Sequence, residues 1–235
     1  MIIPGGYKPD KKNPEAVRAY EARKAEEERA RAAERADLLR RAQEGEAEAQ
    51  YLYGKRLIDG DGIKKDAAEA AKWFRKAAGQ GHAAGQNALG NCYFEGAGVE
   101  KDVAEAVRLY RKSAEQGYAG GLINLGNCYY KGDGVTGDDA EAVRLYSKAA
   151  AQGDAKAQFN LGLCYKEGRG VARSDAEAAR WYKKAAEQGN AKAQTWLGNC
   201  YYLGAGVEQN CAEAVRWYKK AAEQGNAKAQ NNLGS

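Results

Sequence analysis

Cysteine is the residue type with the most chemical potential in this chain, because thiols can bind metals, form disulfides or act as nucleophiles. Four of the five cysteines are spaced 36 residues apart: Cys92, Cys128, Cys164 and Cys200. Equivalent positions in stacked repeats lie roughly 10 Å apart, whereas disulfides need Cα atoms within about 7 Å. We therefore expect small buried thiols in a reducing compartment, with Cys200 and Cys211 as the one pair worth testing for a disulfide.

Other residue types with catalytic potential are sparse. The single histidine, His82, falls at the turn that opens a predicted helix, so we interpret it as a capping residue and not as a base. With one histidine, no Ser-His-Asp or Cys-His arrangement can be built elsewhere. Paired glycines follow no strand and precede no Gly-Lys-Ser/Thr, which excludes a phosphate loop, and paired acids such as Asp138 and Asp139 are explained by helix capping. The sequence predicts no enzyme, no metal and no cofactor.

Glycine recurs with a period of 36 residues, which is typical of a solenoid. One glycine position is filled by Gly54, Gly90, Gly126, Gly162, Gly198 and Gly234. A Gly-x-Gly pair recurs at Gly60 and Gly62, Gly96 and Gly98, Gly132 and Gly134, Gly168 and Gly170, and Gly204 and Gly206. The period predicts five units without insertion, at 46–81, 82–117, 118–153, 154–189 and 190–225.

Each unit shows two segments of about 12 to 14 residues with helical spacing of apolar residues, which we name helix A and helix B. Residues such as Asp154, Asn190 and Asn226 are suitable N-caps for helix A, which would end at the Gly-x-Gly pair. Capping boxes predict the start of helix B at Asp66 with Glu69, Asp102 with Glu105, Asp138 with Glu141, Ser174 with Glu177, and Asn210 with Glu213. The sequence thus predicts an all-α fold.

The glycine inside helix A needs a physical reason, since it costs about 1 kcal/mol relative to alanine. Close packing of helix B against Gly54 and its equivalents would supply that reason. Aromatic pairs such as Trp73 and Phe74 would then fill the space between units. Because one unit cannot bury this face alone, the units must stack.

The repeated string A-x-A-Q-x-x-L-G-x-x-Y-x-x-G-x-G-V-x-x-D-x-x-E-A-x-x-W-Y-x-K-A-A-x-Q-G resembles the Sel-one-like repeat (SLR), a relative of the tetratricopeptide repeat. The resemblance covers 46–235 and implies a right-handed superhelix with helix A on the concave face. It also implies roles as adaptor or scaffold in signalling, protein quality control and bacterial host contact. A secreted bacterial branch of the family joins its two helices through a cysteine in each, but here helix B has cysteine only at Cys211. The penicillin-binding activity of that branch is therefore not carried over.

The two ends depart from the repeat. Residues 1–13 are predicted to be a disordered leader, and 14–45 one long helix with Asn13 as cap and Pro14 at its first position. Its last turns align with helix B and would cap the array as a half repeat, while the alternative is that residues 14–35 project as a charged or coiled-coil arm. Residues 226–235 begin a sixth helix A, from which we expect the chain to continue beyond Ser235.

Charge and hydropathy limit the classes of partner. The net charge is +5, and acids and bases alternate without blocks of one sign, so we expect neither nucleic acid nor anionic lipid as a partner. No stretch approaches the roughly 18 apolar residues of a membrane span, and the first residues lack the apolar core of a signal peptide. We expect a cytoplasmic protein, or a secreted one if a signal peptide has been removed; the oligomeric state is left open.

The candidate binding face is the side of helix A opposite the packing glycine, by analogy with the tetratricopeptide relatives. It comprises Tyr51, Lys55, Asn87, Asn91, Phe94, Ile123, Asn127, Tyr130, Phe159, Leu163, Lys166, Thr195, Asn199 and Tyr202. Asn91, Asn127 and Asn199 share one repeat position and would form an amide ladder for an extended peptide backbone, with aromatic residues as apolar anchors. The alternative is that asparagine here only solvates the surface.

The leading functional hypothesis is a non-enzymatic scaffold or adaptor that binds a peptide or protein segment along this face. A second hypothesis makes the chain the regulatory or targeting region of a larger protein whose activity lies beyond Ser235. A third makes it a secreted bacterial factor for host interaction or the cell wall, which the missing cysteine pairs and the missing signal disfavour.

Overall fold

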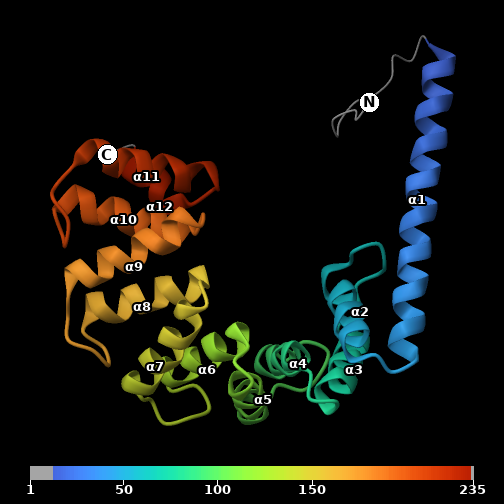
Figure 1. The fold of residues 1–235 in the computed structure, drawn as a ribbon, viewed down its shortest axis with the longest axis horizontal. Helices are drawn as coiled ribbons and strands as arrows, with labels where there is room; N and C mark the ends of the chain where they lie inside the picture. The colour runs from blue at the N-terminus through green and yellow to red at the C-terminus, as the bar shows by residue number, and fades with distance from the viewer. Residues whose placement is uncertain (1–12, 234–235) are drawn as a thin grey trace.

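The chain folds as a solenoid of helix pairs (Figure 1). The computed structural model describes residues 13–233, so all of the predicted leader (1–13) except Asn13, together with Gly234 and Ser235, lies outside the described residues. Within that range all regular elements are helices: α1 (Pro14–Gln43), α2 (Ala47–Asp59), α3 (Ala67–Gly79), α4 (Ala83–Glu95), α5 (Val103–Glu115), α6 (Ala119–Lys131), α7 (Asp139–Ala151), α8 (Ala155–Glu167), α9 (Asp175–Glu187), α10 (Ala191–Leu203), α11 (Cys211–Glu223) and α12 (Ala227–Leu233). The pairs α2–α3, α4–α5, α6–α7, α8–α9 and α10–α11 form units 1 to 5, which confirms the predicted all-α architecture.

Helix boundaries follow the predicted capping residues. Each helix A from α2 to α10 ends at a left-handed glycine, for example Gly132 with φ 76°. Each helix B begins behind a side chain that accepts from the backbone three residues on, as Asp138 Oδ1 does from Glu141 N at 3.0 Å. The glutamate of this box is engaged elsewhere: Glu141 pairs with Arg144 at 2.6 Å instead of reaching back to the cap.

The glycine within helix A contacts an aromatic ring of its own unit. A Cβ atom added at Gly126 would lie 2.7 Å from the ring of Tyr146, and the same close approach recurs in the other units. This confirms the prediction that helix B needs a glycine opposite it. The second aromatic residue of each pair packs on the glycine of its own unit, and in unit 4 it also contacts the next unit, where Tyr182 stacks on Trp196.

Neighbouring units are joined by loop and side-chain contacts. From unit 2 onward the second glycine of each pair lies against the first turn of helix B in the preceding unit, and a Cβ at Gly98 would be 2.1 Å from the carbonyl oxygen of Ala67. Glutamines add polar links along the array, since Gln116 Nε2 donates to Gln86 Oε1 at 2.8 Å. These contacts hold successive units in a fixed orientation.

Helix α1 combines the two alternatives that the sequence left open. Its last turns bury Leu38 and Ala42 against the hydrophobic core of unit 1. Residues 21–34 are exposed, and the helix extends well past α2 (Figure 1). At the other end α12 packs on α11 as the start of a sixth helix A. Among the described residues, no helix combines the length and apolar character needed to cross a membrane.

Candidate functional site: a groove on the inner face of the arc

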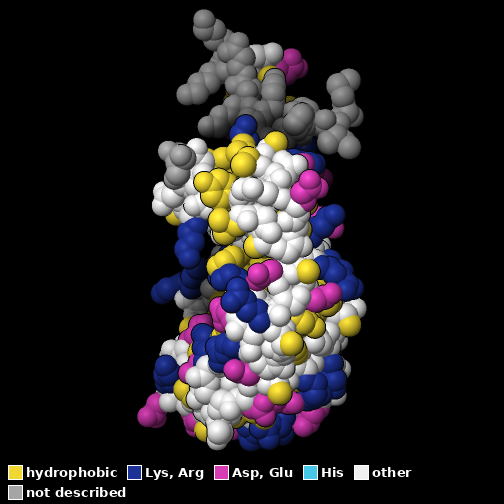
Figure 2. All heavy atoms as spheres, turned by 90° about the vertical axis from the view of Figure 1, so that its left-hand side faces the viewer, with side chains coloured by type: hydrophobic (Ala, Val, Ile, Leu, Met, Phe, Trp, Pro, Cys, Tyr) yellow, Lys and Arg dark blue, Asp and Glu magenta, His cyan; other side chains and the backbone are white. Residues whose placement is uncertain are grey.

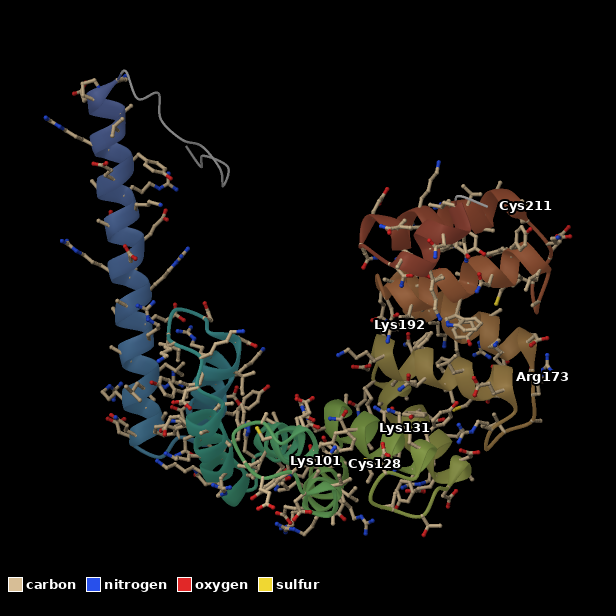
Figure 3. The ribbon with its side chains drawn as sticks, turned by 180° about the vertical axis from the view of Figure 1, so that it is seen from behind. Lys101, Cys128, Lys131, Arg173, Lys192 and Cys211 are labelled. Atoms are coloured by element: carbon tan, nitrogen blue, oxygen red, sulfur yellow. The ribbon has the colours of Figure 1, made fainter. Side chains whose placement is uncertain are left out.

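The A helices line the inner side of the arc. Helix α2 contacts α4, and α4 contacts α6, although each pair is separated in sequence by a B helix. Figure 3 shows Lys131 of α6 and Lys192 of α10 on the inner side of the C-terminal half, with Arg173 and Cys211 on its outer side. Side chains of helix A therefore face the space that the arc encloses.

A groove of about 680 Å³ crosses this face from α6 to the start of α10. Its lining combines apolar side chains, amides and lysines: Ile123, Asn124, Asn127, Tyr130, Lys131, Tyr146, Lys156, Phe159, Asn160, Leu163, Asn190, Ala191 and Lys192. A smaller pocket of about 160 Å³ continues toward α4 and shares Asn124, Asn127 and Lys131 with the groove. We call the larger space the groove and the smaller one the side pocket.

The structure brings together about half of the predicted face. Five predicted residues line the groove: Ile123, Asn127, Tyr130, Phe159 and Leu163. Asn91 and Phe94 line the side pocket. The remaining predicted residues are not among the lining residues of either: Tyr51, Lys55, Asn87, Lys166, Thr195, Asn199 and Tyr202.

Burial divides the predicted residues further. Ile123, Phe159 and Thr195 are only 7%, 9% and 5% exposed, so they belong to the hydrophobic core or its border. Ile123 and Phe159 expose only one edge of the side chain to the groove. Lys55 and Tyr202 are exposed, Tyr202 at 55%. Thr195 donates to the Ala191 carbonyl at 3.0 Å, which leaves its hydroxyl engaged within α10.

The asparagine ladder exists, but its oxygens are occupied by the protein itself. Asn127 Oδ1 accepts from the Tyr146 hydroxyl at 2.7 Å and from Asn160 Nδ2 at 3.2 Å. Asn91 is held in the same way by Tyr110 and Asn124, and Asn199 by Tyr218 and Asn232. Asn87 Oδ1 also accepts from Asn124, at 2.9 Å. The expectation that these oxygens are available to a peptide must therefore be corrected, and what the ladder can offer is its amide N–H groups.

Tyr130 is part of a bridge between units 3 and 4. The Arg169 guanidinium lies 3.6 Å from the centre of its ring, and the Tyr130 hydroxyl donates to Glu167 at 2.5 Å. Burial and the Glu167 carboxylate together raise the pKa of Tyr130 to about 12. Arg169 also forms a two-pronged ion pair with Asp139, at 2.6 and 3.0 Å, which raises the pKa of this arginine. Tyr130 is thus held in place as a wall of the groove.

Unit 4 departs from the ladder. Leu163 occupies the asparagine position, and the residue that would pair with it from unit 5 is Trp196. The buried hydroxyl of Tyr182 consequently finds no hydrogen-bond partner among the described residues. Trp196 stacks on the Tyr182 ring with centroids 6.0 Å apart, and Lys166 Nζ lies 4.1 Å from the Trp196 ring centre. At unit 4 the base of the groove is therefore apolar, and we call this part the apolar floor. Units 2, 3 and 5 carry a pair of hydrogen-bonded asparagine side chains at the equivalent positions.

The prediction from sequence missed the lysines and three of the asparagines in the groove: Asn124, Asn160 and Asn190. Lys156 and Lys192 lie in the first turns of α8 and α10, and Lys131 is the last residue of α6. The sequence does contain a signal for Lys156 and Lys192, because their shared repeat position varies between units. It is glutamate in unit 1 and a small residue in units 2 and 3. Asn124 and Asn160 bond to the ladder from the following unit.

The cysteines and the histidine have structural roles here. Cys92, Cys128, Cys164 and Cys200 are buried, as predicted, and all five thiols are free, with Cys211 exposed. Burial raises the pKa of Cys128 and Cys200 to about 11 and that of Cys164 to about 12, so these thiols stay protonated at neutral pH.

His82 acts as the N-cap of α4. Its Nδ1 atom accepts from Gly85 N at 3.1 Å, and its Nε2 atom lies 2.8 Å from a carboxylate oxygen of Glu48. This confirms the prediction of a capping residue. Within residues 13–233 no cluster of histidine, cysteine and acidic side chains has the arrangement of a metal site.

Comparison with known proteins identifies the repeat. The model of the Sel1 repeat matches five consecutive segments, at 47–82, 83–118, 119–154, 155–190 and 191–226. A comparison with proteins of curated function finds no match.

Solved structures show the same repeat architecture. The chain is similar to a protective antigen of uropathogenic Escherichia coli strains that displays an SLR fold, with 42% identity over 84% of this chain and a TM-score of 0.74. It spans only 42% of the length of that antigen. A Sel1 repeat protein from Oxalobacter formigenes is 37% identical, with 80% of this chain and 75% of that one covered and a TM-score of 0.75. An immunity protein from Pseudomonas aeruginosa is 28% identical over 78% of this chain and 67% of its own, with a TM-score of 0.57.

Proposed function

Because the chain belongs to the Sel1 repeat family, whose members generally mediate protein–protein interaction, we propose that it is a non-enzymatic scaffold that binds an extended segment of a partner protein in the groove. The observation that carries this proposal is the groove itself, an open space of about 680 Å³ on the inner face of the arc. Its apolar floor and amide N–H groups suit a peptide, which presents apolar side chains and carbonyl oxygens together.

The dimensions of the groove suit an extended segment. Neighbouring helix axes lie about 10 Å apart and an extended chain rises ~3.3 Å per residue, so each repeat accommodates about three residues. From α6 to α10 the groove crosses two repeat steps, which corresponds to about six residues of a partner.

A substitution that fills the groove tests the proposal. Alanine at Asn127 or Tyr130 would also break bonds to Tyr146 or Glu167, so a loss of binding would not separate recognition from stability. Lys156 is exposed at the groove, and Lys156→Trp would occupy the space without removing any of these bonds. Lys183→Trp, on the exposed surface of α9, is the matched control.

The measurement is binding of fluorescent peptides selected by the wild-type protein from a random displayed library. We expect Lys156→Trp to weaken binding at least about tenfold, the loss typical of an obstructed interface centre, and the control to bind within about twofold of wild type. Selected peptides that bind Lys156→Trp as tightly as wild type would place recognition elsewhere and overturn the proposal.

A second candidate, a factor that contacts a host, is favoured by the 42% identity to an E. coli protective antigen. The two candidates differ in location, since we propose the cytoplasm for the scaffold on the ground of its free thiols. Fractionation of the source cells with an antibody to this chain decides between them. Recovery from the medium or the cell surface supports the second candidate, and recovery with cytoplasmic markers supports the first.

A further inference from the structure

Resting on the proposed function, we propose that the segment bound in the groove is acidic: an apolar side chain seated on the floor, flanked by aspartate or glutamate residues. Three lysines, Lys131, Lys156 and Lys192, line the groove, and none of its lining residues is acidic. All three lysines are exposed at the ends of helices that face the interior of the arc, as Figure 3 shows for Lys131 and Lys192.

These three lysines have no ion-pair partner among the described residues, a property they share with most lysines of the array, where Lys72 is an exception that pairs with Glu69 at 3.0 Å. Some arginines of the B helices are neutralised within their own helix, as Arg108 is by Glu105 and Arg144 by Glu141, at 2.5 and 2.6 Å. Lys131, Lys156 and Lys192 make no ion pair with any residue between 13 and 233. Their charges are therefore available to a partner, and unpaired lysines around one groove attract acidic side chains.

The charge of the A-helix face changes sign along the array. At the repeat position of Lys156 and Lys192, the chain has Glu48 in unit 1, then Ala84 and Gly120. At the position of Lys131, units 1 and 2 carry Asp59 and Glu95. The position of Lys156 and Lys192 carries lysine again at Lys228 in α12, so the positive charge marks the C-terminal part of the array and is not a uniform property of the repeat.

Three acids lie near this set in sequence or in repeat position: Asp154, whose side chain caps α8, Asp133, which lines the side pocket, and Glu167. Glu167 is the unit 4 equivalent of Lys131, and its carboxylate accepts from the Tyr130 hydroxyl at 2.5 Å. It is not among the lining residues of the groove. Within the groove the charged lining residues are the three lysines, whereas Glu95 and Asp133 line the side pocket beside Lys131, so the acidic segment is expected in the groove and not in the side pocket.

The floor supplies the second recognition element. Leu163 replaces the ladder asparagine and lies with the edges of Ile123 and Phe159 at the base of the groove. An apolar side chain placed there removes apolar surface from water on both partners, which contributes affinity, while the surrounding lysines contribute selectivity and association rate. An acidic segment without an apolar residue would meet only half of the site.

A nucleic acid is the other polyanion to consider, and the surface favours a peptide. Figure 2 shows acidic and basic side chains interspersed over the outer face of the C-terminal half, without a continuous basic track for a phosphate backbone. The aromatic rings that line the groove offer little stacking surface for a base, because Arg169 lies 3.6 Å from the centre of the Tyr130 ring and Phe159 is only 9% exposed.

The test compares two charge reversals of equal size. One variant combines Lys131→Glu, Lys156→Glu and Lys192→Glu, and the control combines Arg173→Glu, Lys183→Glu and Lys219→Glu, which are exposed and lie outside the groove. The wild-type protein first selects peptides from a random displayed library, and the selected peptides are titrated against both variants by fluorescence anisotropy. Circular dichroism confirms that both variants keep the wild-type helix content.

We expect the selected peptides to be enriched in aspartate and glutamate around an apolar residue. Their affinity should fall on the order of tenfold or more for the groove variant and less than about twofold for the control, with a further loss as salt is raised. Peptides without an excess of acids, or equal affinity for both charge variants, would overturn the inference.

These outcomes are separable from failure of the proposed function. Peptides without acidic enrichment whose binding is still lost in Lys156→Trp would leave the groove as a peptide site and remove only its preference for acids. A labelled single-stranded oligonucleotide serves as the competing probe. Binding of that oligonucleotide more tightly than the best peptide, with loss in the groove variant, would assign the lysines to nucleic acid and overturn the proposal.

Discussion

Units 3 and 4 are built on the same framework but differ at the inner face. In unit 3 (118–153) the Tyr146 hydroxyl donates to Asn127, which also accepts from Asn160 of the next unit. In unit 4 (154–189) the corresponding residues are Leu163 and Tyr182, with Trp196 from the next unit, and the buried hydroxyl of Tyr182 has no partner among the described residues. Both units keep the glycine under the tyrosine ring.

The difference shows which parts of the repeat are needed for stacking and which are open to change. The contact between glycine and tyrosine recurs in both units, with a Cβ atom on Gly126 or Gly162 placed 2.7 or 2.6 Å from the ring. The polar link can be lost at one unit, although an unpaired buried hydroxyl costs about 1–3 kcal/mol. Unit 4, which lacks the polar link, instead contributes the apolar floor of the groove that the proposed partner would contact.

The largest effect is expected where the two units are alike. Gly126→Val and Gly162→Val should each lower the free energy of unfolding by about 3 kcal/mol, since the new side chain overlaps a buried ring that cannot move away. Guanidinium denaturation followed by circular dichroism measures the loss. Gly79→Val is the control, because a Cβ there meets no atom within 4 Å. A much smaller loss for Gly162→Val than for Gly126→Val would show that the two frameworks are not equivalent.

The second largest loss of stability is expected when unit 3 receives the leucine of unit 4. Asn127→Leu leaves the Tyr146 hydroxyl and the Asn160 amide without their acceptor, and we expect a loss of about 2 kcal/mol. Adding Asn160→Trp reproduces the pair found in units 4 and 5 and should recover part of that loss. A double-mutant cycle on the unfolding free energy measures this coupling, and strict additivity would show that Leu163 and Trp196 do not act together.

A smaller loss is expected when only the hydroxyl of unit 3 is removed. Tyr146→Phe keeps the ring on Gly126 and deletes the bond to Asn127, whose oxygen retains Asn160 as a donor. The free energy of unfolding should fall by about 1 kcal/mol. Tyr110→Phe in unit 2 repeats the experiment at an equivalent bond, and its loss should agree. No measurable change in either variant would mean that the ladder contributes nothing to stability.

The periodic framework could be predicted from the sequence because its signals are local. Gly132 ends α6 through its positive φ, and Asp138 caps α7 through the residue three positions on. Such signals act within a few residues and recur in every unit, so the helix boundaries followed from the repeat alone. The need for close packing at Gly126 followed from its cost inside a helix.

The chemistry of the inner face could not be predicted in the same way. The amide oxygen of Asn127 is occupied by residues 19 and 33 positions later in the chain, and which atoms meet depends on the angle between units. Arg169, in a loop of the next unit, covers the Tyr130 ring. Tyr130 was expected to be an apolar anchor for a peptide, and this ring face is no longer accessible. The groove lysines at the helix ends were not predicted, because the analogy with tetratricopeptide repeats selects positions in the middle of helix A.

The smallest effect, and the sharpest test of the comparison, is expected in unit 4. Tyr182→Phe removes a hydroxyl that has no partner among the described residues, while the ring keeps its contacts with Gly162 and Trp196. Since no bond is lost and the desolvation cost of the hydroxyl disappears, stability should stay equal or rise by up to about 1 kcal/mol. The same denaturation experiment measures it beside Tyr146→Phe, so the two substitutions differ in the sign of their effect. A loss of about 1 kcal/mol, as in unit 3, would show that the Tyr182 hydroxyl is satisfied by bound water, and that the inner face of unit 4 is wetter than its apolar floor implies.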